Sequence, residues 1–110
     1  TGTGDAPDRL DAILADDFAT LDALRVAEDA RITGYADGLD ATTLAGPFTY
    51  RPITRPDAAV TQPLAPALAH VFNHQTHHRG QVHALLTRIA GRAPELDLIF
   101  YQRETGIGMA

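Results

Sequence analysis

The stretch HVFNHQTHHRGQVHALL, residues 70–86, contains all five histidines of the chain. Apolar residues recur through and around it at spacings of three and four, which predicts a long amphipathic helix from about Leu64 to Ile89. Gly91 and Pro94 follow and are expected to end this helix. The fold therefore depends on a helix that is unusually rich in imidazoles, and the function depends on what those imidazoles do.

An earlier apolar stripe predicts another long helix, starting at Asp8 and ending at Gly34 or Gly38. A break near Asp16, giving a short helix and then a long one, is the alternative. The stripe has the three-and-four spacing of one helical face. Its members are Leu10, Ile13, Leu14, Phe18, Leu21, Leu24, Ile32 and Tyr35.

Residues 40–63 have a different character, with several prolines and two short β-favouring runs, FTY and AAVTQ. They predict either a small hairpin or an extended excursion between the helices. Residues 47–61 would then form a hairpin or a lid. The tail, residues 95–110, has an apolar centre, so its first part is expected to pack back on the helices.

The expected fold is all-α, with residues 1–110 forming a single domain. Two long amphipathic helices do not close a bundle, because each can bury only one stripe against the other. Either a second copy of the chain completes the core, or a further part of the natural chain does.

Composition narrows the class of function. Fourteen acidic and nine basic residues leave a net charge of −5, which argues against binding to nucleic acid or to an anionic membrane surface. There is no cysteine for a disulfide or a thiolate site, and no apolar run long enough to span a membrane. The N-terminus lacks the features of a signal peptide, so we expect a cytoplasmic protein.

A helical projection separates the five histidines. His74 and His78 fall inside the apolar arc of the predicted helix, His70 and His77 lie at its edge, and His83 lies well away. A buried imidazole needs a partner for each ring nitrogen, and two imidazoles one turn apart have few ways to satisfy each other. A shared cation would solve this problem, because an i, i+4 histidine pair can converge on one ion. The alternative is a hydrogen-bonded polar seam without metal.

Other catalytic patterns do not fit. The residue after His74 is Gln75, where the helical metalloprotease motif requires a glutamate as general base. The chain has only three glutamates, too few for a di-iron bundle, and it has no serine for a Ser–His–Asp triad.

The central motif resembles the C-terminal signature of the DinB (damage-inducible) family. The family's pattern Asn-His-x-x-His-His-Arg-Gly-Gln is matched by Asn73, His74, His77, His78, Arg79, Gly80 and Gln81. The following Gly-x-x-Pro-x-x-Asp, residues 91–97, extends the resemblance, which covers the whole chain.

This resemblance implies a four-helix bundle that holds one divalent metal through three histidines. Two of them match His74 and His78. The third comes from a helix near the N-terminus in the family, and this chain has no histidine before His70. We therefore expect the C-terminal portion of a DinB-like bundle, with the N-terminal helices missing.

By resemblance, the expected function is that of a metal-dependent enzyme, either a thiol-dependent S-transferase or a hydrolase acting on a small molecule. The ion would be zinc, nickel, iron or manganese, and a low-molecular-weight thiol is a candidate partner. His74 and His78 would be the ligands, and four residues would surround them or line a pocket: His70, Asn73, His77 and Gln81.

Two other classes of function stay open. The chain could be a non-catalytic helical dimerisation module, a homodimer whose histidine seam is structural or binds metal only between subunits. It could also be a stress-response protein that binds a small ligand without turnover.

Overall fold

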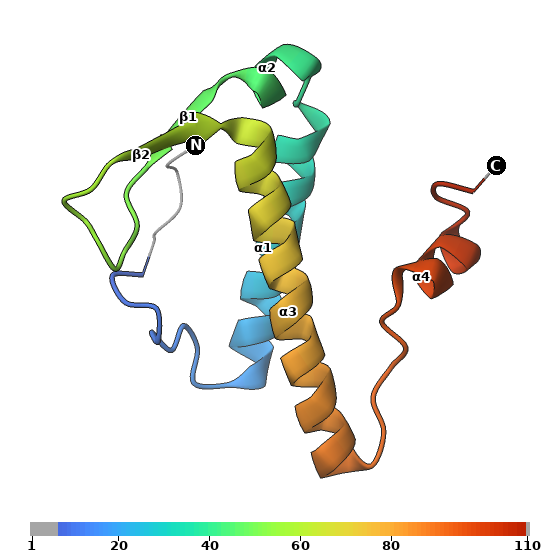
Figure 1. Cartoon of the computed structure of the whole chain (residues 1–110). Helices are drawn as coiled ribbons and strands as arrows, with labels where there is room; N and C mark the ends of the chain where they lie inside the picture. Colours follow the sequence, from blue (N-terminus) through green and yellow to red (C-terminus); the bar gives the residue numbers. More distant parts are fainter. Residues whose placement is uncertain (1–6, 110) are drawn as a thin grey trace. The chain divides into compact units, whose positions relative to one another are not determined.

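The computed structural model describes residues 7–109 (Figure 1). The elements in that range are α1 (Phe18–Asp37), α2 (Ala41–Ala45), β1 (Pro47–Tyr50), β2 (Val60–Pro63), α3 (Leu64–Ala90) and α4 (Leu98–Thr105). The chain divides into two compact units, with the boundary between Leu68 and Ala69 inside α3. Each unit is described by itself below.

Helix α1 starts at Phe18, so the predicted start at Asp8 was wrong. The alternative of a break near Asp16 is confirmed for the long helix, but no short helix precedes it within residues 7–15. The Asp17 carboxylate accepts a hydrogen bond of 2.8 Å from the backbone N–H of Thr20, which caps the first turn. Before this cap the chain forms turns and bends, and Leu10 and Ile13 are 76% and 83% exposed. Helical spacing without a surface to pack against does not stabilise a helix of that length.

The predicted end of the first helix is confirmed at Gly38, which follows Asp37 as the C-cap. Two ion pairs on the surface of α1 join residues one turn apart: Arg25 with Asp29, and Arg31 with Glu28. Exposed pairs of this kind add little to stability. They nevertheless support the helical conformation of a segment that has no buried residue.

Residues 40–63 form a short helix followed by a hairpin. Helix α2 was not predicted, and Asp40 caps it by accepting a 2.7 Å hydrogen bond from the backbone N–H of Thr43. Strands β1 and β2 pair in antiparallel register, with Pro47 opposite Pro63. Of the two predictions for this region, the hairpin is therefore confirmed and the extended, unpaired segment is not.

Helix α3 confirms the predicted second helix to within one residue at its end. Its first backbone N–H, on Leu64, donates a 3.0 Å hydrogen bond to the carbonyl of Gly46 just before the hairpin. Gly91 follows the helix with φ 73°, a left-handed conformation that favours glycine. A Cβ at Gly80, in the middle of α3, would meet no atom within 4 Å, so no other described segment approaches the helix closely there.

The tail forms helix α4, which the sequence did not predict as a helix. It ends at Gly106, whose left-handed φ of 74° lets the backbone N–H bond to the carbonyl of Gln102. The apolar side chains of α4 stay largely exposed, among them Leu98 and Phe100.

The apolar core of the described residues is very small. Only Leu64 and Ala67 are buried hydrophobic residues, at 6% and 7% exposure. The helical class of the fold is confirmed, whereas closure into a four-helix bundle and the single-domain organisation stay predictions. Among the described helices, none is both long and apolar enough to cross a membrane.

Candidate metal centre

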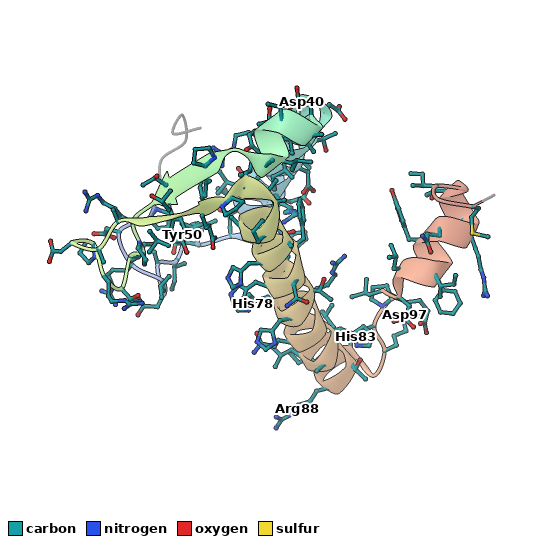
Figure 2. The ribbon with its side chains drawn as sticks, turned by 45° about the horizontal axis from the view of Figure 1, so that its top comes forward. Asp40, Tyr50, His78, His83, Arg88 and Asp97 are labelled. Carbon is teal, nitrogen blue, oxygen red and sulfur yellow. The ribbon has the colours of Figure 1, made fainter. Side chains whose placement is uncertain are left out.

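The histidine-rich part of α3 brings two imidazoles into contact. His74 and His78 lie one turn apart, and their Nε2 atoms are 2.9 Å from each other. The two rings are nearly perpendicular, with centroids 4.5 Å apart. On the other side of its ring, Nδ1 of His78 lies 2.8 Å from Oε1 of Gln81. Figure 2 shows His78 projecting from the side of α3.

The contact with Gln81 selects one tautomer of His78. An amide oxygen can only accept a hydrogen bond, so Nδ1 of His78 must carry the proton. In the neutral ring, Nε2 of His78 then has a lone pair, which accepts the 2.9 Å hydrogen bond donated by the Nε2–H of His74. This is the tautomer that a metal-binding imidazole adopts when a neighbouring group orients it.

The environment of His74 favours the same neutral state. Partial removal of water lowers the pKa of His74 below its usual 6.5, although the residue is exposed overall, and His78, His70 and His77 add repulsion in the same direction. Metal ions bind the neutral form of imidazole, so this shift favours ligation near neutral pH.

The predicted burial of the pair is wrong for the described chain. His74 and His78 are both exposed, because the apolar arc around them is itself exposed. The cost of burying unpaired ring nitrogens therefore does not apply here. The case for a metal site rests instead on the convergence of the two Nε2 atoms.

The remaining residues predicted around the pair differ in what they contact. His70 and His77 stack against the ring of His74, with centroids 5.6 and 5.9 Å away. Gln81 makes the contact described above, whereas Asn73 has no side-chain hydrogen bond among the described residues. His83 is half-buried and lies on a different side of α3 (Figure 2).

The spacing of the pair can be compared with that of metal ligands. Two nitrogens at about 2.0–2.1 Å from one ion, and at about 90° to each other, lie about 2.9 Å apart; a tetrahedral angle needs about 3.3–3.4 Å. The observed 2.9 Å is the length of a hydrogen bond between the two rings, as in the polar seam considered above, and it also matches the spacing of two neighbouring ligands at about 90°. Within residues 7–109, however, no group of three or more potential ligands converges. The described residues fit two ligands of a site and not the three that the resemblance implied.

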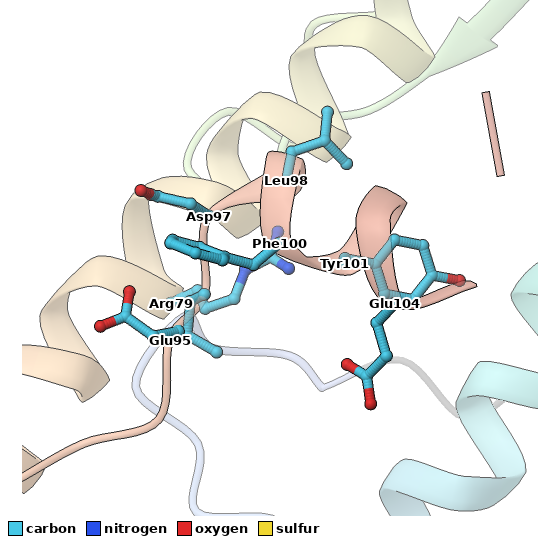
Figure 3. A pocket seen from close by; sticks show the side chains of 8 residues that line it. Arg79, Glu95, Asp97, Leu98, Phe100, Tyr101 and Glu104 are labelled. Carbon is cyan, nitrogen blue, oxygen red and sulfur yellow. The ribbon is translucent and has the colours of Figure 1, made fainter. Parts of the chain in front are cut away.

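A second feature lies on another face of α3, within residues 69–110. Arg79 and the segment that includes α4 enclose a half-open hollow of about 410 Å³ (Figure 3). Its lining combines one guanidinium with carboxylates and apolar side chains: Glu95, Leu96, Asp97, Leu98, Phe100, Tyr101 and Glu104. The guanidinium of Arg79 donates one 3.3 Å hydrogen bond, to Oγ1 of Thr76.

This hollow was not predicted. The only sequence feature that could have indicated it is the alternation of acidic and apolar residues at the start of the tail. The turn after Gly91 that sets the tail opposite Arg79 could not be read from spacing.

The model of the DinB family matches residues 14–108, which include all of α1–α4. The chain belongs to the DinB family. The predicted family is therefore confirmed, and it is a helical, generally metal-associated one. No curated protein and no solved structure matches this DinB-family chain.

Proposed function

We propose that this DinB-family chain binds a divalent transition-metal ion through Nε2 of His74 and Nε2 of His78, and that the resulting site serves a metal-dependent enzyme acting on a small molecule. The observation that carries the proposal is the 2.9 Å separation of the two Nε2 atoms on an accessible face of α3. Zinc, nickel, iron and manganese all accept imidazole ligands.

Each residue around the site has a separate role in this proposal. His74 and His78 hold the ion, and the hydrogen bond to Gln81 orients the ring of His78 so that its Nε2 is available to the ion. His70 and His77 restrict the motion of His74 by stacking. A bound ion of this kind lowers the pKa of a coordinated water or thiol, or polarises a carbonyl.

Thiol transfer to an electrophilic small molecule is the reaction that we propose to test first, and hydrolysis the second. Two protein ligands leave several coordination positions free for a thiol and a substrate. The sequence contains no serine and no cysteine, and in this proposal the attacking group is a coordinated thiol or water.

Elemental analysis of the purified chain tests the metal site directly. We expect bound transition metal in the wild type and little in His78→Ala, while His83→Ala, on another side of α3, retains it. Consumption of a low-molecular-weight thiol with an electrophile would then be measured with and without metal. Metal retained in His78→Ala would refute the assigned ligands, and metal binding without turnover would refute the enzymatic part alone.

The hollow beside Arg79 favours a second candidate function, the binding of a small ligand without turnover. Arg79 could hold a carboxylate, the acidic residues could hold an ammonium group, and Leu98 and Phe100 could cover an apolar part. A zwitterion with an apolar side chain has this combination. A thermal-shift series of amino acids on the wild type and on Arg79→Gln tests it, and the absence of any Arg79-dependent shift would refute it.

A further inference from the structure

We infer that the hollow beside Arg79 binds a basic amino acid, which carries a carboxylate, an α-ammonium group and a second positive charge at the end of its side chain. The inference rests on the second candidate function and adds to it the class of ligand, and it does not depend on the metal-binding pair. Its starting point is that Arg79 and three carboxylates line one hollow, with no ion pair between them within residues 7–109.

The guanidinium of Arg79 is held in position while most of its donors remain available. Its Nη2 donates a 3.3 Å hydrogen bond to Oγ1 of Thr76, and the Thr76 hydroxyl donates in turn to the carbonyl of Phe72 at 3.1 Å. A guanidinium has five N–H donors, and the described residues accept from only one of those of Arg79. A ligand carboxylate can therefore pair with the remaining N–H groups in a bidentate arrangement.

The lining of the hollow is more negative than positive. Three carboxylates, those of Glu95, Asp97 and Glu104, stand against the single guanidinium of Arg79, which leaves an excess of two negative charges. A neutral zwitterion would pair its carboxylate with Arg79 and its ammonium group with one of the acids. Two acidic side chains would then lack a counter-charge, whereas a ligand with a second positive group pairs with one of them as well.

The charged side chains lie in two places along the hollow. Arg79, Glu95 and Asp97 also line a neighbouring hollow of about 320 Å³, so these three lie together where the two hollows meet. Glu104 lines only the larger hollow, and Figure 3 shows it beside Tyr101 and apart from Arg79. The carboxylate and α-ammonium groups of the ligand therefore belong at the Arg79 end, and the second positive group belongs at Glu104.

Apolar side chains in the same hollow suit the aliphatic stem of such a ligand. Leu98, Phe100 and Tyr101 line the hollow and are exposed, so a ligand can cover their apolar surface. The ring of Phe100 already lies beside one cation of the chain, because Cζ of Arg103, which does not line the hollow, is 5.9 Å from the ring centroid. The volume of about 410 Å³ is in the range of small-molecule sites.

Three matched ligands test the charged groups one at a time. Lysine carries all of them, norleucine lacks only the distal ammonium group, and cadaverine lacks only the carboxylate. Nuclear magnetic resonance titration of the whole labelled chain at pH 7 and low salt measures each Kd. An exposed ion pair contributes up to about 1 kcal/mol, so we expect lysine to bind about 2- to 5-fold more tightly than either of the other two.

Two variants assign the charged groups to their partners. Glu104→Gln should remove the preference for lysine over norleucine without changing the Kd of norleucine, and Arg79→Gln should remove the preference for lysine over cadaverine. Two controls remove the same charges outside the hollow: Asp57→Asn, between β1 and β2, and Arg88→Gln, in the last turn of α3. Both controls should keep both preferences, and circular dichroism verifies that the helices remain in every variant.

The pattern of binding separates this inference from the second candidate function. Equal Kd values for lysine and norleucine would overturn the inference and leave Arg79-dependent binding of neutral amino acids intact. A preference for lysine over norleucine that persists in Glu104→Gln, or that is lost in a control, would overturn the assigned position of the distal group. Cadaverine that binds as tightly as lysine would overturn the role of Arg79, and no binding of any of the three ligands would overturn both proposals for the hollow.

Discussion

Replacing Gln81 with leucine should weaken metal binding without removing a ligand. In the structure, Oε1 of Gln81 accepts the Nδ1 proton of His78 at 2.8 Å and so keeps Nε2 free of a proton. Leucine has a similar volume but cannot accept a hydrogen bond. In the variant, His78 can therefore rotate and can exchange tautomers, and only part of its population presents Nε2 to the ion.

The exposure of the pair decides how large the loss should be. Groups that orient metal ligands typically change affinity about 10- to 100-fold when they are removed. Gln81 and His78 are exposed, so water can replace the lost hydrogen bond. A net value of about 0.5–1.5 kcal/mol for such a bond corresponds to an increase in Kd of about 2- to 13-fold.

Competition with a chromogenic chelator at pH 7.5 measures the zinc affinity of each variant. Gln75→Leu is the matched control, because Gln75 lies on the same helix and shows no side-chain hydrogen bond to an imidazole in the described chain. We expect His78→Ala to lose far more affinity than Gln81→Leu, and Gln75→Leu to bind like the wild type.

Two results would refute this reasoning. An unchanged Kd in Gln81→Leu, with a large loss in His78→Ala, would show that the amide does not orient the ring. An equal loss in Gln75→Leu and Gln81→Leu would show that either change acts by disturbing the helix. Nitrogen chemical shifts of His78 give an independent measure of the tautomer, which should be mixed only in Gln81→Leu.

Three further outcomes are expected from the fold. Gly34→Ala, inside α1 with open space for a Cβ, should raise the free energy of unfolding by up to about 1 kcal/mol, whereas Gly91→Ala, at φ 73°, should lower it by about 1 kcal/mol. Thermal unfolding of the two variants measures the difference. A stabilising effect of Gly91→Ala would contradict the role of Gly91 in ending α3. Leu64→Ala should lower the unfolding free energy by about 2–3 kcal/mol because Leu64 is one of the two buried residues, and a chemical denaturation curve that matches the wild type would show that this core does not contribute. The capping hydrogen bonds lower the pKa of Asp17 and of Asp40, so their stabilisation is complete above the unfolded pKa of about 4 and is lost as the pH falls through the lower folded values. Helicity followed by circular dichroism should therefore drop in acid, and Asp17→Asn should reduce that drop.

The sequence-based predictions succeeded where a feature depends on residues close together in the chain, and failed where it depends on contacts between distant segments. Helix α3 was predicted almost to the residue because its apolar spacing and the glycine after it act locally. The first helix was predicted too early, since residues 8–17 have helical spacing but nothing to pack against. The hairpin was predicted only as one of two alternatives, because pairing between β1 and β2 joins residues distant in the sequence.

The same distinction applies to the features of the candidate site. The convergence of His74 and His78 follows from their i, i+4 spacing, and the contact of Gln81 with His78 from an i, i+3 spacing. These are properties of one helix and need no tertiary structure. Exposure of the pair was not foreseen, because it depends on what covers the helix.

By itself, the sequence determined the family, the long histidine-rich helix and the contact between two of its imidazoles, since all of these depend on residues close together in the chain. Only the tertiary structure decided that the pair is exposed, that no third ligand joins it within residues 7–109, and that the tail encloses a hollow beside Arg79. Those features depend on how separate segments meet in space. That arrangement is set by burial over the whole molecule, which local periodicity does not encode.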